Sequence, residues 1–365
     1  MKTQENHNFR VGTILSYILF LGWTLLTILP LFWMAYSSFK SNEELTRDIY
    51  AFPKDLFENV DDEYVVIAPS LNLMMPKEVR SATSEYLIIE STSIAPNRLL
   101  MVHYLPKKDL DPHVAQRKTG DKIYVNELPR RLQRQVNRTT IWFNYTSAFR
   151  RGALGGKFLN SILYASVSTF LMVFFSLMIG YAVSKFPFKK LSAVVMGLIG
   201  VGYLISTNSV IIPLFLMLSN LSLTDTHVGI ILVYTAFGIP MSVLLASQFI
   251  RGLPDSLIES AEIDGAGMFR AFRSIIIPMT VPVIITISII NALGIWNEFL
   301  LVLVLASKEI TKSLPVGVYS FSSLTSTQLG WQLAALVIAT LPTMLVYFSF
   351  NRRITRGVVA GAVKG

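Results

Sequence analysis

Cysteine is absent from the 365-residue sequence. Disulfide bonds, thiolate metal sites and cysteine nucleophiles are therefore excluded. Histidine is scarce, and the histidines never fall at the spacing that a metal site requires. No structural or catalytic metal is expected. The four histidines are His7, His103, His113 and His227.

Charge is also scarce. Charged residues make up 15% of the chain, hydrophobic residues make up 52%, and the mean hydropathy is +0.51. Because an ordinary soluble domain has about 25% charged residues, this composition indicates a membrane protein. The formal net charge of +9 could suggest nucleic-acid binding, but the basic residues are scattered and flank apolar segments. Such residues orient membrane spans, so no nucleic-acid partner is expected.

Six apolar segments are each near the length of about 20 residues that a helix needs to cross a bilayer. The first follows a polar, basic start, as in a signal peptide. It is too long for one and lacks a small-residue cleavage site, so we interpret it as a retained span. The six predicted spans are residues 11–36, 158–183, 191–218, 228–250, 277–305 and 331–350.

The distribution of lysine and arginine predicts the orientation of these spans. With the amino terminus in the cytoplasm, the inner segments hold twelve basic residues, whereas the short outer loops hold only Lys308 and Lys312. An excess of basic residues is typical of cytoplasmic loops. The other basic residues lie in a segment too long for this rule to apply. Both termini are therefore expected in the cytoplasm, with arginines after the last span anchoring it there.

The segment 41–156, between the first two spans, is polar and charged. It contains four short β-like runs separated by Asn, Asp, Pro and Gly. We predict a small, β-rich extracytoplasmic insertion. Two interpretations remain open: a platform for a substrate-loaded binding protein, and a surface insertion that the fold tolerates. The four runs are residues 64–67, 86–89, 99–102 and 122–125.

A polar island, residues 254–282, separates the fourth and fifth spans. Ser256 stands three residues before Glu259, which is the spacing of a capping box. Gly265 can end a helix by adopting a left-handed conformation. These signals predict one short helix, residues 256–264, at a membrane surface. On helix signals alone it is either a docking element for a groove on another protein or a connector between two spans.

This island resembles the EAA loop, a cytoplasmic loop in the membrane subunits of ABC importers. The resemblance rests on a Glu-Ser-Ala triplet, a glycine four residues after its alanine, and an Ile-x-Ile-Pro end. Ser260 replaces an alanine and Ile277 a leucine, and both changes are mild. In that family the loop inserts into a groove on the ATPase subunit. The residues that the resemblance assigns to ATPase coupling are Glu259, Ser260, Ala261, Asp264, Gly265, Ala266, Ile275 and Pro278.

Other motifs are similar to the sugar-importing, maltose-type branch of this family. The resemblance implies the type I ABC importer permease fold, an all-α polytopic membrane protein with six transmembrane helices. It does not cover most of the insertion. The motifs are Asp264-Gly265-Ala266 with Pro282, Trp-Phe-Asn-Tyr at 142–145, Trp-Asn-Glu-Phe at 296–299 and Leu-Pro-Val-Gly at 314–317. The implied parts are residues 1–40 with the first span, the insertion 41–156, the permease core 157–350 and the tail 351–365.

The resemblance further implies a permease subunit of an ATP-driven, binding-protein-dependent importer for an oligosaccharide or related sugar. Its membrane would be the cytoplasmic membrane of a bacterium or archaeon. The expected partners are a second, homologous permease, an ATPase dimer, an extracytoplasmic substrate-binding protein and the lipid bilayer. The chain itself is expected to be no enzyme and to hold no cofactor, because ATP and Mg²⁺ bind the ATPase subunits. Gly155-Gly156-Lys157 is no phosphate-binding loop, since Arg151 and Phe158 occupy positions that need glycine and Ser/Thr.

Residues of a substrate pathway are expected in the fifth span. Glu298 is an ionisable residue in an apolar run, which is costly unless it faces a cavity or a partner. It lies about 30 Å along a helix that starts near residue 277. It therefore either lines the outer mouth or reaches the interface with water. The candidate pathway residues are Asn291, Trp296, Asn297 and Glu298.

Two other functions are considered. An importer of an amino acid, a peptide or an anion would share the EAA loop. A stand-alone secondary transporter would show internal repeats or buried ion-coupling residues in corresponding halves, and neither is found.

The small-residue end, residues 360–365, resembles the termini of maltose-type permeases, and we expect a flexible tail that threads between ATPase subunits.

Overall fold

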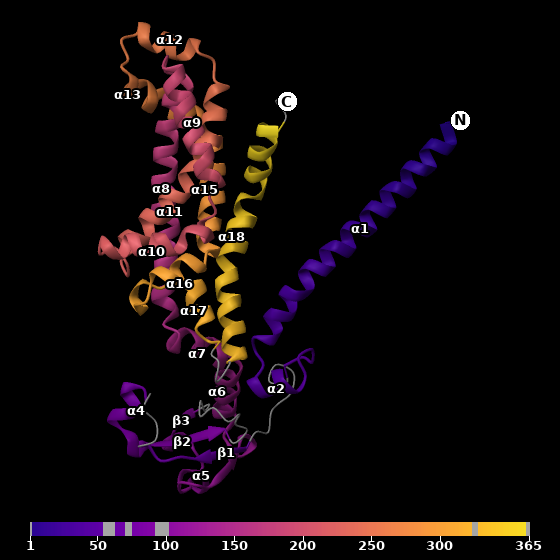
Figure 1. Ribbon diagram of the computed structural model, residues 1–365. Helices are drawn as coiled ribbons and strands as arrows, with labels where there is room; N and C mark the ends of the chain where they lie inside the picture. Colours follow the sequence, from indigo (N-terminus) through magenta and orange to yellow (C-terminus); the bar gives the residue numbers. More distant parts are fainter. Residues whose placement is uncertain (1, 54–62, 70–74, 92–101, 323–327, 363–365) are drawn as a thin grey trace. The chain divides into compact units, whose positions relative to one another are not determined.

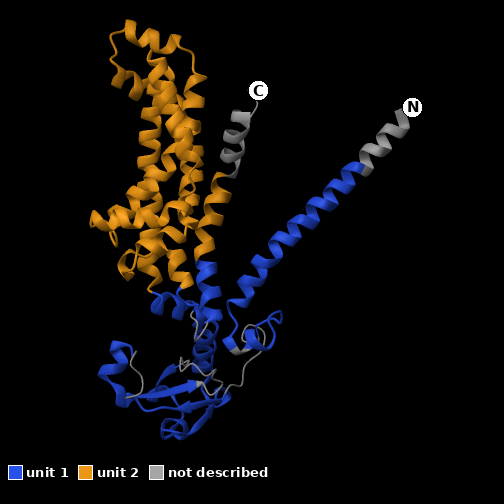
Figure 2. Ribbon diagram, in the orientation of Figure 1, with its two compact units in different colours: residues 1–152, 320–338 blue, residues 153–319, 339–365 orange. Residues whose placement is uncertain are grey.

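The computed structural model describes residues 2–53, 63–69, 75–91, 102–322 and 328–362, and it is mainly helical (Figure 1). The chain divides into two compact units (Figure 2). Unit 1 comprises Met1–Gly152 and Ser320–Ile338, and unit 2 comprises Ala153–Tyr319 and Ala339–Gly365.

Unit 2 is built on three helices that pack side by side: α8 (Leu154–Lys185), α11 (His227–Arg251) and α15 (Val281–Asn297). A Cβ atom added at Gly180 of α8 would lie 3.1 Å from the backbone nitrogen of Ser247 in α11. A glycine at this position therefore lets the two backbones approach closely, which is the usual way in which membrane helices associate.

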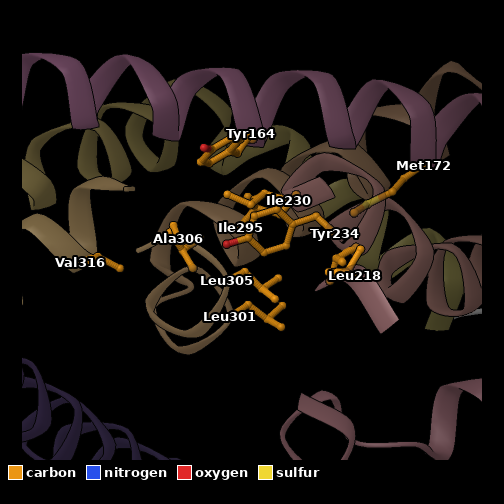
Figure 3. Packing of buried hydrophobic residues seen from close by; sticks show 13 residues of the cluster. Tyr164, Met172, Leu218, Ile230, Tyr234, Ile295, Leu301, Leu305, Ala306 and Val316 are labelled. Atoms are coloured by element: carbon orange, nitrogen blue, oxygen red, sulfur yellow. The ribbon is translucent and has the colours of Figure 1, made fainter. Parts of the chain in front are cut away.

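Two hydrophobic clusters fill this bundle. The first lies where α10, α16 and α17 meet α8 and α11 (Figure 3). The second lies toward the other end of α8 and α11, near α12. Each cluster joins elements that are distant in the sequence, so together they hold the ends of the bundle. The first consists of Tyr164, Ala165, Met172, Leu218, Ile230, Val233, Tyr234, Ile295, Leu301, Val302, Leu305, Ala306 and Val316, and the second of Leu177, Tyr181, Ala246, Ile250, Phe272, Ile276, Val283 and Ile287.

Among the described residues, four helices are long and apolar enough to cross a membrane. Two further pairs pass the same test but are bent, by 84° and by 74°, and counting each pair as one span gives up to six. The predicted spans 191–218 and 277–305 thus each contain such a bend. The four helices are Gly12–Ser37, Leu154–Lys185, His227–Arg251 and Leu329–Phe350, and the bent pairs are Lys189–Leu204 with Thr207–Asn220 and Met268–Met279 with Val281–Asn297.

The second bend has a local cause at Thr280, a residue with no exposed surface. Its hydroxyl donates to the carbonyl oxygen of Ile276 at 2.7 Å, and Pro278 and Pro282 flank it without N–H groups to continue the helical ladder. The remaining elements of unit 2 are α9 (Lys189–Leu204), α10 (Ile211–Asn220), α12 (Ser256–Ile263), α13 (Met268–Ala271), a π-helical turn (Phe272–Ile276), α14 (Ile277–Met279), α16 (Leu300–Leu305), α17 (Leu314–Tyr319) and 3-10 turns at Thr207–Val210 and Glu309–Thr311.

Unit 1 contains α1 (Lys2–Ser37), whose side chains are exposed over residues 12–32. Ser38 and Lys40 directly follow α1. Their carbonyl oxygens accept hydrogen bonds from the side-chain amide of Asn144 in α7 (Phe143–Arg151), at 2.8 and 2.7 Å. Asn144 belongs to the Trp-Phe-Asn-Tyr motif, and this clamp is its structural role. A short helix, α2 (Asn42–Arg47), begins two residues after Lys40.

The insertion contains a four-stranded antiparallel sheet in the order β3-β2-β1-β4. Three of the predicted runs coincide with strands, whereas the run 99–102 overlaps β3 only at Val102, and residues 99–101 lie outside the described part. The insertion also holds helices that were not predicted, of which α6 is the longest. Its elements are β1 (Glu63–Val66), α4 (Lys77–Ser81), β2 (Tyr86–Ser91), β3 (Val102–Pro106), α5 (Pro112–Ala115), β4 (Lys122–Tyr124), α6 (Arg130–Ile141) and 3-10 turns at Thr83–Glu85, Lys107–Asp109 and Val125–Glu127.

The last helix, α18 (Leu329–Ala362), continues past the predicted end of the sixth span. The flexible tail expected at residues 360–365 is therefore helical as far as Ala362, and residues 363–365 lie outside the described part. Gly155 and Gly156 lie in the first turn of α8, so they form no loop that could bind phosphate.

Candidate functional site

The predicted short helix is α12 (Ser256–Ile263), one residue shorter than expected, and it lies at one end of unit 2 beyond α8 and α15 (Figure 1). The predicted capping box is not formed: Asp255 occupies the N-cap position, and no side chain caps the helix. Lys185 of α8 donates instead to Oδ1 of Asp255 at 2.5 Å and to the carbonyl oxygen of Leu253 at 2.6 Å. A contact from another helix thus sets the start of α12.

The end of α12 is set by Gly265, as predicted. Its φ is +74°, a left-handed conformation that favours glycine. The N–H of Gly265 donates to the carbonyl oxygen of Glu262 at 3.0 Å, and that of Ala266 donates to the carbonyl oxygen of Ala261 at 2.8 Å. This pair of bonds is a Schellman motif. It turns the chain sharply toward α13.

The inner side of this segment rests on the second hydrophobic cluster. Ala261 is buried, and Ile258 packs against the cluster. The following π-helical turn contributes Phe272, which stacks on Tyr181 of α8 with ring centroids 5.8 Å apart, and Ile276, which has no exposed surface. A displacement of α12 would therefore act directly on the packed ends of α8 and α11.

The outer side of the segment combines acidic and apolar residues. Glu259, Glu262 and Asp264 are exposed. Beside them, Ile263 is 87% exposed and Phe269 70% exposed. Exposed apolar side chains in the same short segment as exposed carboxylates are typical of a surface that binds another protein.

The other residues assigned to ATPase coupling contribute to the local structure of the segment or lie where it returns to the bundle. Ser260 donates its hydroxyl hydrogen to the carbonyl oxygen of Ser256 at 2.7 Å. Ile275 is half-buried in the π-helical turn, and Pro278 is exposed in α14. The assigned residues thus form one continuous segment, with Glu259 to Ala266 at its tip and Ile275 and Pro278 where it returns to the bundle.

Two of the candidate pathway residues bind neighbouring helices. Asn291 donates from Nδ2 to Oγ of Ser242 in α11 and to the carbonyl oxygen of Ile287, both at 2.9 Å. Trp296 is buried, and its Nε1 donates to the carbonyl oxygen of Ala339 in α18 at 3.1 Å. Both side chains hold the bundle together from within.

The other two lie where α15 ends. Asn297 is exposed, and its amide donates to the carbonyl oxygen of Leu293 at 2.8 Å. Glu298 is half-buried and uses both carboxylate oxygens: Oε2 accepts from the hydroxyl of Tyr234 at 2.8 Å, and Oε1 accepts from the N–H of Leu301 at 2.9 Å. The carboxylate therefore joins α11 to the first turn of α16.

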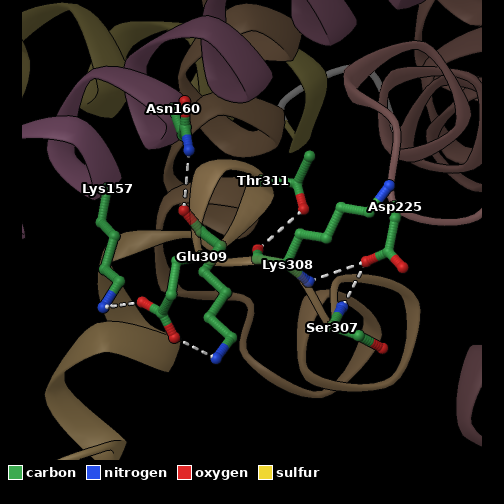
Figure 4. A network of polar contacts seen from close by, with 8 residues as sticks. Lys157, Asn160, Asp225, Ser307, Lys308, Glu309 and Thr311 are labelled. Carbon is green, nitrogen blue, oxygen red and sulfur yellow. Dashed lines mark hydrogen bonds and ion pairs between the residues drawn. The ribbon is translucent and has the colours of Figure 1, made fainter.

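A polar network at the α16 end of unit 2 was not predicted (Figure 4). Nζ of Lys157, a buried residue of α8, lies 2.9 Å from Oε2 of Glu309, which also pairs with Lys312. These bonds, first from Lys312 and then from Lys157, lower the pKa of Glu309. Oδ1 of Asp225 accepts from the backbone N–H groups of Ser307 and Lys308. Lys157 was the signal in the sequence for this network, because a charged side chain in the first turn of an apolar helix needs a partner.

The described residues contain no group of three or more His, Asp or Glu side chains that could hold a metal ion. The polar network of Figure 4 is instead a set of direct ion pairs and hydrogen bonds that close the loop between α16 and α17 against α8.

Comparison with protein families matches residues 141–360 to the family described as binding-protein-dependent transport system inner membrane component. The matched region includes α12, the π-helical turn and all four candidate pathway residues. It begins after the sheet of the insertion.

Individual relatives carry names of sugar permeases. The chain is 35% identical over 225 residues to the diacetylchitobiose uptake system permease protein NgcG of Streptomyces coelicolor, covering 60% of this chain and 74% of that protein. It is 33% identical over 234 residues to the trehalose transport system permease protein SugB of Mycobacterium tuberculosis, covering 62% and 83%. A crystal structure of a bacterial ABC transporter involved in the import of the acidic polysaccharide alginate shares the fold, with a TM-score of 0.61 at 15% identity over 94% of this chain and 96% of that chain.

Proposed function

The chain belongs to the family of binding-protein-dependent transport system inner membrane components, and on that premise we propose that it is a permease subunit of an ATP-driven oligosaccharide importer. It forms half of the translocation pathway, and a second, homologous permease forms the other half. The names of the relatives, which include diacetylchitobiose and trehalose permeases, support a sugar as the substrate.

The observation that carries the proposal is the surface of α12 and the turn after it. Exposed Ile263 and Phe269 stand beside exposed carboxylates, while Ile258 and Phe272 connect the same segment to the core of the bundle. Such an element can bind a groove on an ATPase subunit and transmit its movement to α8 and α11. ATP and Mg²⁺ bind those ATPase subunits, and this chain supplies the response: nucleotide binding favours one orientation of the bundle, and hydrolysis resets it.

The proposed topology has six spans in a bacterial or archaeal cytoplasmic membrane. The four long helices and the two bent pairs support this number. Both termini and α12 face the cytoplasm, which agrees with the concentration of lysine and arginine on that side. The insertion 41–156 is then extracytoplasmic, where a substrate-binding protein delivers the sugar. The permease core spans residues 157–350.

Substrate contacts are assigned to the end of α15. Asn297 presents an exposed amide, and Glu298 lies next to it at the break between α15 and α16. Asn291 and Trp296 position this end by binding α11 and α18. An amide beside a carboxylate suits the hydroxyl groups of a saccharide, which both donate and accept hydrogen bonds.

The test is uptake of radiolabelled oligosaccharides by membrane vesicles that contain the full assembly, with and without ATP. Glu259→Lys combined with Gly265→Val is expected to abolish ATP-dependent uptake and to release the ATPase subunits in a mild-detergent pull-down. Membrane insertion of the variant should be unchanged. Uptake that persists after ATP depletion, or wild-type uptake by the variant, would contradict the proposal. Uptake of amino acids, peptides or anions alone would reassign the substrate.

A further inference from the structure

Helix α6 (Arg130–Ile141) is fixed to the sheet of the insertion by one of its faces. Leu132 and Val136 are buried in the same hydrophobic cluster as Tyr64 and Ile89 of the sheet. Thr140 is buried one turn further on and donates its hydroxyl hydrogen to the carbonyl oxygen of Val136 at 3.0 Å. Since these residues are four apart, they occupy one side of the helix. The opposite side is held outward.

The charged side chains of the outward side are all basic. This side carries four arginines that are all exposed and that form no ion pair within the described part of the chain; they are Arg130, Arg131, Arg134 and Arg138. The helix contains no acidic residue. Arg130, Arg134 and Arg138 are successive members of an i, i+4 series, so their guanidinium groups lie in a row about 12 Å long at 1.5 Å per residue.

This arrangement lowers the stability of the helix. Like charges four residues apart cost about 0.2–0.5 kcal/mol per pair, and Arg130 with Arg134 and Arg134 with Arg138 form two such pairs. Arg130 and Arg131 also stand in the first turn, where the positive end of the helix dipole disfavours cations. An anionic surface against this side would remove each of these costs.

The basic character extends beyond the helix. Residues 112–156 contain nine lysines and arginines and two acidic residues, whereas residues 41–111 contain seven and thirteen. The insertion is therefore polarised along its sequence, with α6 in its positive part. A concentration of charge of one sign steers the approach of an oppositely charged partner and sets its orientation.

The shape of the surface selects the kind of partner. A helix that lies on a membrane inserts an apolar face between the lipid headgroups, but the apolar face of α6 is already buried against the sheet. A small anion or saccharide needs a concave site, whereas the exposed side of a helix is convex. A folded protein with an acidic surface fits both constraints.

We propose that the arginine face of α6, formed by Arg130, Arg131, Arg134 and Arg138, is the docking surface for an acidic patch on the extracytoplasmic substrate-binding protein. This inference rests on the proposed function and assigns to the insertion the role of a docking platform rather than a tolerated insertion.

The test uses the complete importer in lipid nanodiscs, with the substrate-binding protein that stimulates its ATP hydrolysis. We expect Arg→Gln at all four positions to raise the half-saturating concentration of that protein about tenfold at low salt, because exposed charges at an interface act mainly on the association rate. The dependence of this concentration on salt should become flatter, while the basal ATPase rate stays unchanged. In a variant with Arg→Lys at the four positions, the half-saturating concentration should stay close to that of the wild type.

A matched control removes four exposed basic residues elsewhere in the insertion, with Lys77, Lys107, Lys108 and Lys118 each changed to glutamine. The net charge then changes equally, but docking should not. Because Arg→Gln relieves repulsion within α6, thermal unfolding of that variant should occur no earlier than in the wild type, so weaker docking cannot be ascribed to unfolding.

Three results would overturn the inference. The first is an unchanged half-saturating concentration in the Arg→Gln variant. The second is an equal effect of the control. The third is an effect that appears only in phosphatidylglycerol nanodiscs and not in phosphatidylcholine nanodiscs, which would assign the arginines to lipid. In each case stimulation of the wild type would still support the proposed function, whereas a wild-type importer that no binding protein stimulates would contradict that function itself.

Discussion

The hydroxyl of Tyr234 donates a hydrogen bond to Oε2 of Glu298 at 2.8 Å, and this bond joins the first third of α11 to the break between α15 and α16. Glu298 binds the N–H of Leu301 with its other oxygen. The carboxylate that stands out in the sequence as a costly group thus has two partners, and both of them are on elements of the first hydrophobic cluster.

Tyr234→Phe removes one of these partners and keeps the ring. Because hydrogen bonds to charged groups contribute about 1.5–3 kcal/mol, we expect a loss of about 2 kcal/mol in the free energy of unfolding in detergent. Tyr203→Phe, at an exposed tyrosine, is the matched control and should change little. A double-mutant cycle with Glu298→Gln should show coupling. Purely additive losses would mean that the bond contributes nothing.

Gly265 and Gly267 form a second matched pair. Neither has an atom within 4 Å of an added Cβ, but φ is +74° at Gly265 and −69° at Gly267. Gly265→Ala should therefore cost about 1–2 kcal/mol through the left-handed backbone alone and distort the end of α12, which would lower ATP-coupled uptake. Gly267→Ala should transport normally. Equal uptake by the two variants would show that this backbone conformation is not needed for coupling.

Phe269 and Phe272 lie one turn apart with opposite exposure, at 70% and 5%. We expect Phe269→Ala to leave the stability of the subunit within about 0.5 kcal/mol of the wild type and to weaken its association with the ATPase. Phe272→Ala should instead lower the stability by about 3 kcal/mol, because it opens a cavity against Tyr181. Thermal unfolding and ATPase pull-down, measured on the same preparations, separate the two effects. Loss of stability in Phe269→Ala would exclude a free docking surface there.

His103 makes the insertion sensitive to acid. It is buried in β3 with its ring edge-to-face against Tyr64, and burial lowers its pKa from 6.5 to about 4. The unfolded chain therefore takes up a proton that the folded insertion refuses. Above pH 6.5 this histidine therefore does not lower the free energy of unfolding of the insertion. As the pH drops toward 4, the free energy of unfolding falls by up to about 3 kcal/mol.

Hydrogen exchange of the amides of β3, corrected for the intrinsic rate, measures this loss in the full chain. His103→Leu should remove the step between pH 7 and pH 5, whereas His113→Leu, at an exposed histidine, should retain it. An unchanged step in the His103 variant would assign the acid sensitivity to other groups.

The parts of the fold that depend on local signals could be predicted from the sequence. The long apolar segments that became α8 and α11 are recognisable by length, and the end of α12 follows from Gly265. The start of α12 could not be predicted, because Lys185 of α8 binds Asp255 and replaces the expected capping box. That contact joins residues far apart in the sequence, and no spacing between neighbours reports it.

The bends and the helix of the insertion show two other limits. The apolar pattern of 277–305 is continuous across Thr280, so hydropathy alone does not reveal the bend, although Pro278 and Pro282 mark its position. In α6, by contrast, Leu132 and Val136 recur at helical spacing, so a helix at this position could have been predicted from the sequence. For the candidate site, the position of the segment could be predicted from the sequence, whereas the coupling role of its residues stays a prediction. The contacts of Glu298 with Tyr234 and of Lys157 with Glu309 could not be predicted, because each joins residues far apart in the sequence.

The π-helical turn Phe272–Ile276 gives the connection between α12 and the bundle one residue more than a regular helix would hold. Because i→i+5 hydrogen bonds close a wider turn than the i→i+4 bonds of a regular helix, the turn accommodates this residue with little change in the rotational phase of the chain on either side. The extra residue therefore widens the ladder locally and leaves the direction of the connector nearly unchanged. A single-codon deletion within the turn would restore the regular ladder, so it would test whether coupling needs the wider turn itself.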